Sequence, residues 1–335
     1  MNQDKVFQYM YQKAFLNRTP ISVTIELLTK CNVNCRHCYI PEHKSDGLSY
    51  EKVLEIFAQI RELGVINVSL TGGEIFLRKD ILNIVEVARS YGFRVFLLSN
   101  GTLLNEEIVQ KLSKCHVAEF STTLFSMNPK IHDYITRQTG SHEKLLKNLQ
   151  CLKKYDIPVK IKMPLMSVNA NCIDSVKDYA DYNGFEYKVS PIIYPKSDGN
   201  SDPTLYRISD RQLSQVLKKT DKIGRISNLQ KSDNVPCKAL FYAFSIDANG
   251  DVYPCNSFFY KVGNIYQNTI QYIWNESEAL KTIHSITTED LFECKNCKVQ
   301  EFCDRCPGMV WTEKKSLLEC DSCAKKFAEI RMKGY

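Results

Sequence analysis

Two periodicities alternate along the first 195 residues of the chain. Short runs rich in β-branched and aromatic residues predict strands, and segments with apolar residues three or four positions apart predict helices. The predicted strands are residues 21–28, 65–70, 94–98, 117–124, 159–163 and 187–193. The predicted helices are residues 49–63, 79–91, 105–113, 144–154 and 173–183.

Six strand–helix repeats indicate an α/β fold in which crossover helices connect parallel strands. We expect a partial (β/α)6 TIM-like barrel with a C-terminal cysteine-rich iron–sulfur domain. An open doubly wound sheet has the same periodicity and is the alternative.

Composition and periodicity together divide the chain into four parts. Residues 1–20 form an N-terminal extension, and residues 21–195 form the barrel. Residues 196–236 are rich in Ser, Asp, Asn and Lys, and we expect a linker with one helix at residues 210–220. Residues 237–335 show little periodicity and many cysteines, so their fold would have to come from bound metal.

The composition excludes several classes of protein. Of the 335 residues, 44% are hydrophobic and 24% charged, which excludes disordered, collagen-like and coiled-coil chains. The net charge of +6 is thinly spread, so we expect neither nucleic acid nor a membrane as partner. The N-terminus lacks the apolar core of a signal peptide, and we expect a cytoplasmic protein. The 14 cysteines then predict metal rather than disulfides.

The spacing of the cysteines separates them into three sets. Three lie in the run Cys31-x3-Cys35-x2-Cys38, and eight lie beyond residue 236. The isolated ones, which we expect to be packed thiols, are Cys115, Cys151 and Cys172. Eight thiolates are enough for two four-iron clusters, whereas three leave one iron with an open coordination position. Structural zinc is the alternative for the C-terminal set.

Polar motifs follow four of the predicted strands. The first cysteine run follows the first strand, Thr71-Gly72-Gly73-Glu74 ends the second, Ser99-Asn100 ends the third and Thr123 ends the fourth. In parallel α/β folds the C-terminal ends of the strands share one rim, where chemistry is concentrated. We therefore expect these residues to meet.

The run from Cys31 to Cys38, the following Tyr39 and the later Gly72-Gly73-Glu74 together resemble the radical S-adenosylmethionine (SAM) superfamily. The resemblance implies that Cys31, Cys35 and Cys38 hold a four-iron cluster whose fourth iron binds SAM. It also implies contacts of Gly72, Gly73 and Glu74 with the methionine amine, and of Tyr39 with the adenine. Looser matches for the ribose or the carboxylate are Ser99, Asn100, Thr123 and Arg137. A contact with the cluster region or with solvent is expected for His37 rather than metal ligation.

The C-terminal pattern Cys237-x12-Gly250-x4-Cys255, Cys294-x2-Cys297-x5-Cys303-x2-Cys306 and Cys320-x2-Cys323 resembles the SPASM extension of that superfamily, which carries two auxiliary four-iron clusters. The spacer before Cys306 is one residue shorter than usual, and the chain has a final pair where one cysteine is usual. The resemblance implies that the nearer cluster is held by Cys237, Cys255 and Cys306. It implies that the distal cluster is held by Cys294, Cys297 and Cys303, with Cys320 or Cys323 as the fourth ligand. The remaining cysteine either completes the nearer cluster or leaves it with an open iron.

By this resemblance the protein is a peptide-modifying enzyme with three four-iron clusters and SAM. Reductive cleavage of SAM gives a 5′-deoxyadenosyl radical, and a ribosomally made peptide receives a thioether or carbon–carbon crosslink. An external electron donor of the flavodoxin or ferredoxin type is implied. Only about 20 residues precede the first strand, so we expect any leader recognition to need a separate partner or another surface of the protein. No catalytic acid or base is identified.

Three other functions remain open. An anaerobic sulfatase-maturing enzyme would form formylglycine, but such relatives usually have an aromatic pair where this chain has Tyr39-Ile40. A tetrapyrrole-modifying enzyme of the same superfamily is a further alternative. An iron–sulfur sensor or electron carrier would be no enzyme at all, and the intact Gly72-Gly73-Glu74 motif disfavours it.

Overall fold

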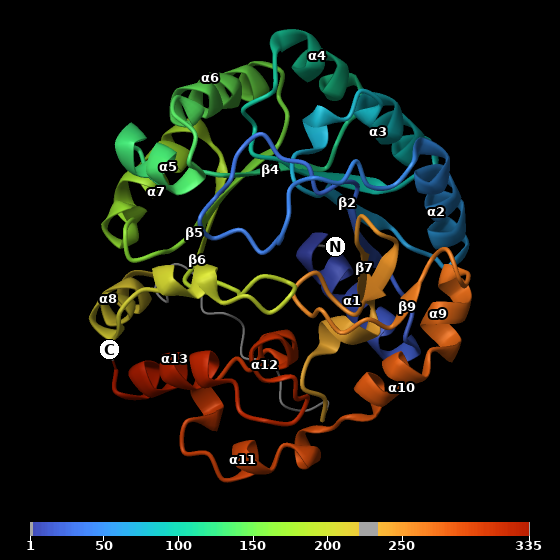
Figure 1. The fold of residues 1–335 in the computed structure, drawn as a ribbon, viewed down its shortest axis with the longest axis vertical. Coiled ribbons are helices and arrows are strands. Elements are labelled where there is room, and N and C mark those ends of the chain that lie inside the picture. Colours follow the sequence, from blue (N-terminus) through green and yellow to red (C-terminus); the bar gives the residue numbers. More distant parts are fainter. Residues whose placement is uncertain (1–2, 221–233, 335) are drawn as a thin grey trace.

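A computed structural model describes residues 3–220 and 234–334 of the chain. It contains one curved nine-stranded sheet in the order β6-β5-β4-β3-β2-β1-β7-β8-β9 (Figure 1). The pairs from β6 to β7 are parallel, and β8 and β9 are antiparallel additions. The strands are β1 (Ser22–Glu26), β2 (Asn67–Thr71), β3 (Arg94–Leu98), β4 (Glu119–Thr123), β5 (Val159–Pro164), β6 (Glu186–Ser190), β7 (Ala243–Ile246), β8 (Asp251–Tyr253) and β9 (Gly263–Asn264).

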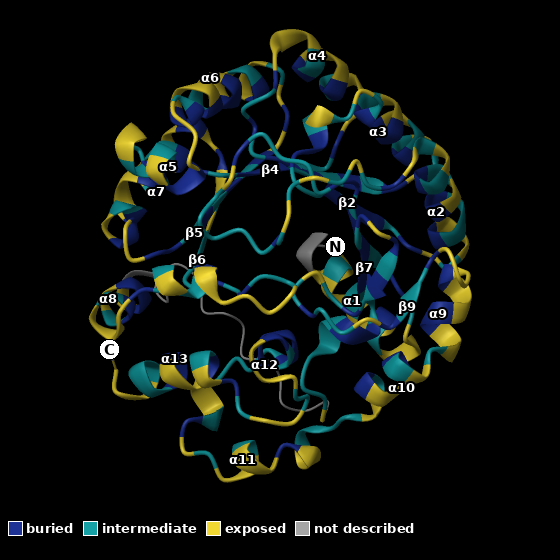
Figure 2. Cartoon of the chain, viewed as in Figure 1, coloured by how far each residue is buried: buried dark blue, intermediate teal, exposed yellow. Residues whose placement is uncertain are grey.

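Helices α2 to α7 cover the outside of the curved sheet (Figure 1). Their apolar sides are buried toward the strands and their polar sides face solvent (Figure 2). These helices and their N-terminal neighbour are α1 (Gln3–Asn17), α2 (Tyr50–Glu62), α3 (Ile81–Ser90), α4 (Glu106–Lys114), α5 (Pro129–Thr136), α6 (Ser141–Lys154) and α7 (Ile173–Asn183). The expected partial barrel is therefore confirmed.

Helix α2 shows how the sequence builds this layer. Ser49 caps its N-terminus by accepting a hydrogen bond from the Lys52 N–H at 3.1 Å. Its apolar stripe is fully buried against the sheet and consists of Val53, Ile56, Phe57 and Ile60. The helix ends before Gly64, and strand β2 begins three residues later. Burial of this stripe fixes the face that α2 presents to the sheet.

The sequence did not predict two helices of the barrel region, namely α1, which precedes β1, and α5, which follows β4. Helix α1 has only a weakly amphipathic sequence, so periodicity gives little signal for it. Helix α5 has eight residues and depends on local signals, namely the Asn128 cap and Pro129 in its first turn. It matters because it packs beside the first cysteine loop, as described below.

Strand β7 joins the C-terminal region to the barrel. It pairs in parallel with β1, with Ser22 opposite Ala243 and Ile25 opposite Ile246. A turn at residues 247–250 connects β7 to antiparallel β8. The sheet is thus continuous across the predicted start of the C-terminal domain at residue 237, and the four-part division stays a proposal. Residues 221–233 of the predicted linker lie outside the described residues.

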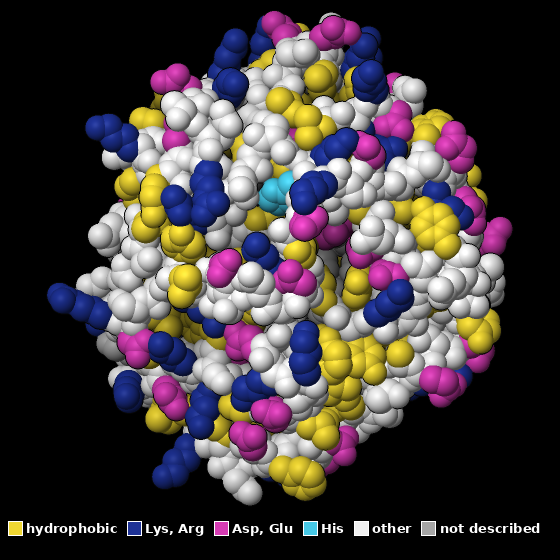
Figure 3. Space-filling view, in the orientation of Figure 1, with side chains coloured by type: hydrophobic (Ala, Val, Ile, Leu, Met, Phe, Trp, Pro, Cys, Tyr) yellow, Lys and Arg dark blue, Asp and Glu magenta, His cyan; other side chains and the backbone are white. Residues whose placement is uncertain are grey.

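The remaining helices are short and surround the C-terminal cysteines. They are α8 (Asp210–Thr220), α9 (Ile270–Glu276), α10 (Glu278–Ser285), α11 (Phe292–Lys295), α12 (Pro307–Lys314) and α13 (Ser322–Met332). The linker helix is α8, with the predicted bounds. Positive and negative side chains are interspersed over the face drawn in Figure 3. Within residues 3–220 and 234–334, no helix is long and apolar enough to cross a membrane.

Candidate functional site

The first cysteine loop, residues 31–38, follows the C-terminal end of β1. Its three cysteines are half-buried and are Cys31, Cys35 and Cys38. The loop is fixed by α5, because the N–H groups of Asn34 and Arg36 donate to the carbonyls of Thr136 and Ile135 at 3.1 and 2.9 Å. The unpredicted helix therefore holds the loop in place.

The three sulfurs share one electrostatic environment. Burial raises the pKa of Cys35, and the neighbouring Cys38 and Cys31 raise it further. Burial also raises the pKa of Cys38 to about 11. Thiolates that burial and mutual repulsion disfavour are stabilised when a metal binds them, so this donor set fits a cationic iron cluster.

His37 lies inside the same loop but faces the protein interior. Burial lowers its pKa to about 4, so its ring is neutral at pH 7. The ring packs edge-on against Phe125 at 5.0 Å between centroids, and its Nδ1 is buried with no partner among the described residues. Of the two contacts expected for His37, with solvent or with the cluster region, the buried ring fits the second, because it packs behind the loop.

Gly72 and Gly73 bring the end of β2 against the loop after β1. A Cβ on Gly73 would lie 2.1 Å from the Lys30 carbonyl oxygen, so only glycine fits this crossing. The Gly73 N–H donates to the Leu28 carbonyl at 2.9 Å, and the Glu74 N–H donates to the Lys30 carbonyl at 2.8 Å. The two glycines thus place Glu74 directly beside the cysteine loop.

The Glu74 carboxylate is fully buried and joins two strand ends. Oε1 accepts from Ser99 Oγ at 2.8 Å and from the Phe76 N–H at 3.0 Å, and Oε2 accepts from the Asn100 N–H at 2.8 Å. Burial raises its pKa, and these three donors oppose that shift. Oε2 keeps capacity for a further donor, so the contact with a ligand amine stays a prediction.

Ser99 and Asn100 lie at the predicted rim, and Asn100 contacts the cysteine loop. Its amide donates to Asn32 Oδ1 at 2.8 Å and approaches Cys31 Sγ at 3.9 Å. Thr123 ends β4 at the same edge of the sheet. Arg137 follows α5 with an exposed side chain and a left-handed backbone. The structure thus brings Asn100 to the loop, and it leaves Arg137 in solvent.

Tyr39 closes one side of a cavity of about 260 Å³. Its hydroxyl donates a hydrogen bond to Glu26 Oε1, and its ring stacks on Phe259 at 5.7 Å. Burial raises the pKa of Glu26 to about 7, opposed by the Tyr39 hydrogen bond, and the Asp247 carboxylate raises it further. The cavity also touches Asn256, next to a C-terminal cysteine. It therefore lies between the first cysteine loop and the C-terminal region.

Sequence reasoning missed Glu26 and Asp247. Glu26 is the last residue of β1, whose burial alternates so that Val23 and Ile25 face the helices. A carboxylate on the opposite face of a barrel strand, directly before the cysteine loop, was the signal that could have found it.

Three C-terminal cysteines form what we call the inner group, and they are Cys237, Cys255 and Cys306. Burial raises the pKa of Cys255 to about 11, and Cys237 and Cys306 raise it further, so the three thiols lie within electrostatic reach of one another. Helix α12 approaches the Cys255 loop closely, since a Cβ on Gly308 would lie 2.3 Å from the Ser257 carbonyl oxygen. The resemblance predicted this set, and the structure brings it together.

A second set, the outer group, comprises Cys294, Cys297, Cys303 and Cys320. Burial raises the pKa of Cys303 to about 12, and Cys294 and Cys320 contribute to the shift. Cys297 likewise raises the pKa of Cys294. Each member thus lies within electrostatic reach of another.

Cys323 lies apart from the outer group. The charged groups that act on it are Arg207, Asp321, Glu313 and Lys326. Burial is the main cause that raises its pKa to about 11. Of the final pair, Cys320 is therefore the cysteine whose charge acts on the pKa of Cys303.

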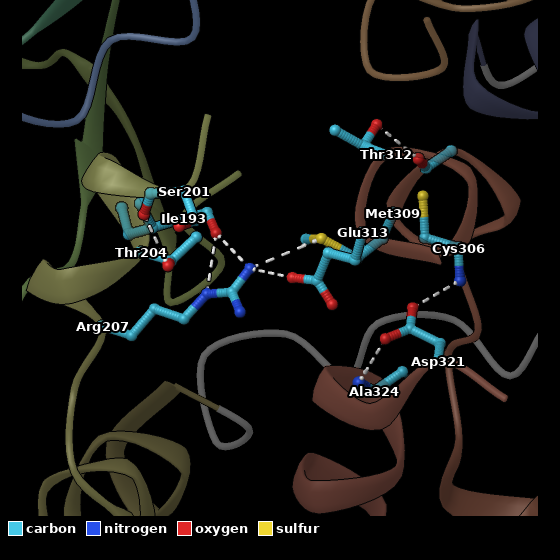
Figure 4. Close-up of polar contacts among 11 residues, drawn as sticks. Ile193, Ser201, Thr204, Arg207, Cys306, Met309, Thr312, Glu313, Asp321 and Ala324 are labelled. Carbon is cyan, nitrogen blue, oxygen red and sulfur yellow. Dashed lines mark hydrogen bonds and ion pairs between the residues drawn. The ribbon is translucent and has the colours of Figure 1, made fainter. Parts of the chain in front are cut away.

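Figure 4 shows how the linker is attached beside Cys306. The Arg207 guanidinium donates to the Ile193 carbonyl at 2.8 and 3.0 Å and pairs with Glu313 on α12 at 2.6 Å. Asp321 accepts from the Cys306 N–H at 3.0 Å and, as the N-cap of α13, from the Ala324 N–H at 2.9 Å. These contacts fix the end of the barrel, α12 and α13 relative to one another.

The spacing within these groups bears on the metal that they fit. Among the described residues, no three Cys, His, Asp or Glu side chains converge as ligands of a single ion. One zinc ion needs four donors about 2.0–2.3 Å from one centre. In a four-iron cluster each thiolate binds a different iron, so its sulfurs lie farther apart.

The three isolated cysteines lie on the outer helices. Cys115 is buried at the end of α4, Cys151 packs from α6 and Cys172 lies at the start of α7. Cys115 Sγ contacts the Lys111 carbonyl, and Cys172 Sγ accepts from Ser126 Oγ at 3.3 Å. Their surroundings are those of packed thiols.

The geometry defines an α/β barrel protein whose strand ends carry an incomplete set of three thiolates and whose C-terminal region carries two further thiol groups. Residues 25–180 match the family model of the radical SAM superfamily, and residues 237–307 match that of the SPASM iron–sulfur cluster-binding domain. The chain belongs to the radical SAM superfamily and carries a SPASM domain. These domains imply four-iron clusters and SAM as the groups that the sites bind.

Three curated proteins illustrate the range of relatives. The AdoMet-dependent heme synthase of Methanosarcina barkeri is 24% identical, over 91% of this chain and 96% of its own length. The subtilosin biosynthesis protein AlbA of Bacillus subtilis is 24% identical, over 86% of this chain and 65% of its own. The sporulation killing factor maturation protein SkfB of the same species is 26% identical, over 83% and 68%. The chain thus spans about two thirds of the last two.

Solved structures share the fold over nearly the whole chain. Streptococcus suis SuiB bound to the precursor peptide SuiA has a TM-score of 0.74 at 17% identity, covering 94% of this chain and 79% of SuiB. The enzyme anSMEcpe with bound AdoMet and a peptide has a TM-score of 0.68 at 19% identity, covering 94% and 98%. At these identities the likeness concerns the fold alone.

Proposed function

We propose that this radical SAM enzyme oxidatively modifies a ribosomally made peptide by forming a thioether or carbon–carbon crosslink. The observation that carries the proposal is the cavity lined by Tyr39, which follows Cys38 in the chain, and by Asn256, which follows Cys255 of the inner group. A side chain in this cavity would lie between the two sets of thiols. Initiation at one set and oxidation at the other both need that placement.

The cysteine sets fit the groups that the family binds. Cys31, Cys35 and Cys38 would hold the cluster that binds SAM, and the inner and outer groups would hold two auxiliary clusters. When bound, these groups supply reductive cleavage of SAM to a 5′-deoxyadenosyl radical, which abstracts a substrate hydrogen, and an acceptor for the substrate's electron. The contacts of Gly72, Gly73, Glu74 and Tyr39 with SAM, and the looser ones of Ser99, Asn100, Thr123 and Arg137, remain part of the proposal.

Glu26 is the group in the cavity best suited to move a proton. Its pKa of about 7 means that it is partly ionised at neutral pH, which favours general acid–base chemistry. The Tyr39 hydroxyl occupies Oε1, so Oε2 is the oxygen that would accept a proton from the substrate. Asp247 accepts backbone N–H bonds from Asn249 and Asp251 at 2.8 and 2.9 Å and is less available.

A peptide substrate is supported by size and by relatives. A volume of about 260 Å³ is of the size of amino-acid side chains and lies just below the usual range for small-molecule pockets, about 300–1,000 Å³. AlbA and SkfB are named for peptide biosynthesis or maturation, and the fold is shared with SuiB in complex with its precursor peptide. An external electron donor of the flavodoxin or ferredoxin type and a separate leader-binding partner are further parts of the proposal.

A tetrapyrrole-modifying enzyme is the second candidate. The heme synthase relative matches this chain nearly end to end, which favours that alternative over formylglycine formation. A flat macrocycle of four pyrroles would, however, need more room than a cavity of about 260 Å³ offers.

Anaerobic reconstitution followed by reduction with SAM tests the proposal. We expect about 12 iron atoms per chain, as three four-iron clusters require, and release of 5′-deoxyadenosine. Iron near four with no SAM cleavage would contradict the three-cluster enzyme. Incubation with Cys-containing precursor peptides and with iron coproporphyrin then separates the two substrates, because a crosslink lowers the peptide mass by about 2 Da and decarboxylation alters only the porphyrin.

A further inference from the structure

Arg305 occupies the short spacer between Cys303 of the outer group and Cys306 of the inner group. Its guanidinium is anchored to the segment before Cys320. Nη2 donates to the Leu317 carbonyl at 2.6 Å and to the Glu319 carbonyl at 2.9 Å, and Nε donates to Glu319 at 3.2 Å. Three bonds to two carbonyls hold the planar fork in one orientation.

One nitrogen of this fork is left over. Arg305 Nη1 is buried and has no hydrogen-bond partner among the described residues. Burial lowers the pKa of Arg305, and the groups that oppose the shift are, in order, Cys294, Asp321, Cys306 and Cys320. The unpartnered nitrogen therefore belongs to a guanidinium that lies within electrostatic reach of Cys294, Cys306 and Cys320.

The nearby carboxylate does not account for this nitrogen. Both oxygens of Asp321 are bound to backbone N–H groups, Oδ2 to Cys306 and Oδ1 to Ala324. A buried cationic donor without an acceptor is destabilising. Sulfur atoms at the cysteines would supply the missing acceptor.

We propose that Arg305 Nη1 donates a hydrogen bond to sulfur of the iron–sulfur cluster held by Cys294, Cys297, Cys303 and Cys320, and thereby raises its reduction potential. The inference rests on the proposed function for the presence of that cluster. One-electron reduction makes the cluster more negative, so a fixed cationic donor stabilises the reduced form more than the oxidised one.

Arg331 provides a matched control on the other side of Cys303. It reaches from α13 to the Phe302 carbonyl at 3.1 Å and the Asp304 carboxylate at 2.8 Å. Its charge is paired and its donors have oxygen acceptors. Replacing it removes a cation bound to the two residues that flank Cys303, without removing the donor proposed here.

The test uses the full chain with Cys31, Cys35 and Cys38 changed to Ala, so that only the auxiliary clusters remain. Reconstitution should give about eight iron atoms. With ¹⁵N-labelled arginine, pulsed electron paramagnetic resonance of the dithionite-reduced protein should show a ¹⁵N coupling. We expect the coupling to vanish in Arg305→Lys and to persist in Arg331→Lys. Eight irons without any arginine coupling, or a coupling that survives Arg305→Lys, would overturn the proposal.

A redox titration measures the consequence. At a fixed potential, Arg305→Gln should lower the ratio of reduced to oxidised cluster about tenfold, equivalent to about 59 mV for one electron. Arg331→Gln should leave it nearly unchanged, and equal shifts in both variants would overturn the tuning role. If the Arg305 variants lose iron, the test of the hydrogen bond rests on the parent protein. A ¹⁵N coupling there supports the proposal, and its absence overturns the proposal.

The ligand set and the proposed function are tested separately. Cys320→Ser should change the coupled spectrum and Cys323→Ser should not, and the reverse result would overturn the assignment of the cluster. Iron near zero in the parent protein would overturn the proposed auxiliary clusters themselves. That result is distinct from eight irons without coupling, which contradicts only the role of Arg305.

Discussion

The first cysteine loop and the outer group both collect thiols, but different forces position them. The loop follows a strand that is paired on both sides, and α5 and fully buried Glu74 fix its surroundings. The outer group lies among short helices, where Arg305 and Arg331 join segments by bonds to carbonyl and carboxylate oxygens. We therefore expect the hydrophobic core to shape the first site before metal binds, and the second site to depend on its metal.

The largest expected effect breaks the chemistry of the first site and leaves the fold intact. Cys35→Ala should abolish SAM cleavage and lower the iron content by about four atoms per chain. The unfolding midpoint should change little, because Cys35 lies outside the main barrel core and packs only against a small cluster around Phe125. Cys151→Ala on α6 is the control, and it should retain both SAM cleavage and the full iron content. Cleavage that survives Cys35→Ala would contradict the assignment of the loop.

Removal of iron should affect the second region far more than the first. Anaerobic chelation should raise amide deuterium exchange about tenfold or more over residues 292–334, since few buried apolar contacts stabilise them. Exchange in β2 to β5 should stay slow. If both regions lost protection together, the comparison would be wrong and the metal would support the whole fold.

Glu26 connects the two regions through the cavity, and Glu26→Gln tests its role. We expect peptide modification to fall by about 10²-fold, because an amide cannot accept a proton at neutral pH. SAM cleavage without peptide should be unchanged. Glu62→Gln, at an exposed position at the end of α2, is the control. Unaltered peptide modification in Glu26→Gln would show that another group moves the proton.

The same substitution changes the pH dependence of stability. The pKa of Glu26 is about 7 in the folded protein, above its ordinary 4.5, with Tyr39, Asp247, Tyr253 and Cys38 nearby. The folded state keeps the proton more tightly, so this stabilising contribution is complete below about pH 4.5 and is lost as pH rises through 7. Glu26→Gln should therefore gain stability relative to wild type between pH 5 and 8, by roughly 3 kcal/mol at most. Urea unfolding at both pH values measures the difference.

Two glycine substitutions sharpen the comparison at the level of packing. Gly73→Ala and Gly308→Ala each force a Cβ onto a carbonyl oxygen, at 2.1 and 2.3 Å, and each should destabilise by about 1–3 kcal/mol. Gly73→Ala should lower global unfolding stability, and Gly308→Ala should mainly raise exchange around α12. Gly184→Asn, in open space at the end of α7, should have little effect. Equal global losses would show that the two regions unfold as one unit.

The elements that the sequence predicted well are those with strong local periodicity. Strand β3 and helices α7 and α8 have the predicted bounds, and β4 is shorter by residues at both ends. Helix α5 was missed because eight residues give too few periods. The pairing of β1 with β7 was not predicted, since a contact between strands more than 200 residues apart leaves no local pattern.

For the sites, spacing predicted which cysteines meet but not what surrounds them. The inner group and most of the outer group follow from the motif, whereas the separation of Cys320 from Cys323 depends on where Asp321 caps α13. Burial of His37 and the unpartnered nitrogen of Arg305 are results of tertiary packing. A sequence pattern carries no information about them.

The pairing of β1 with β7 also has a consequence for synthesis on the ribosome. Strand β1 is made early, and its second neighbour emerges more than 200 residues later. At about 5–20 residues per second, one edge of β1 stays open for roughly 10–45 s in each nascent chain. An unpaired strand edge is a template for association with other chains. Rapid production of this protein therefore favours aggregation through β1, and slower translation or a chaperone that covers this edge should increase the yield of folded enzyme.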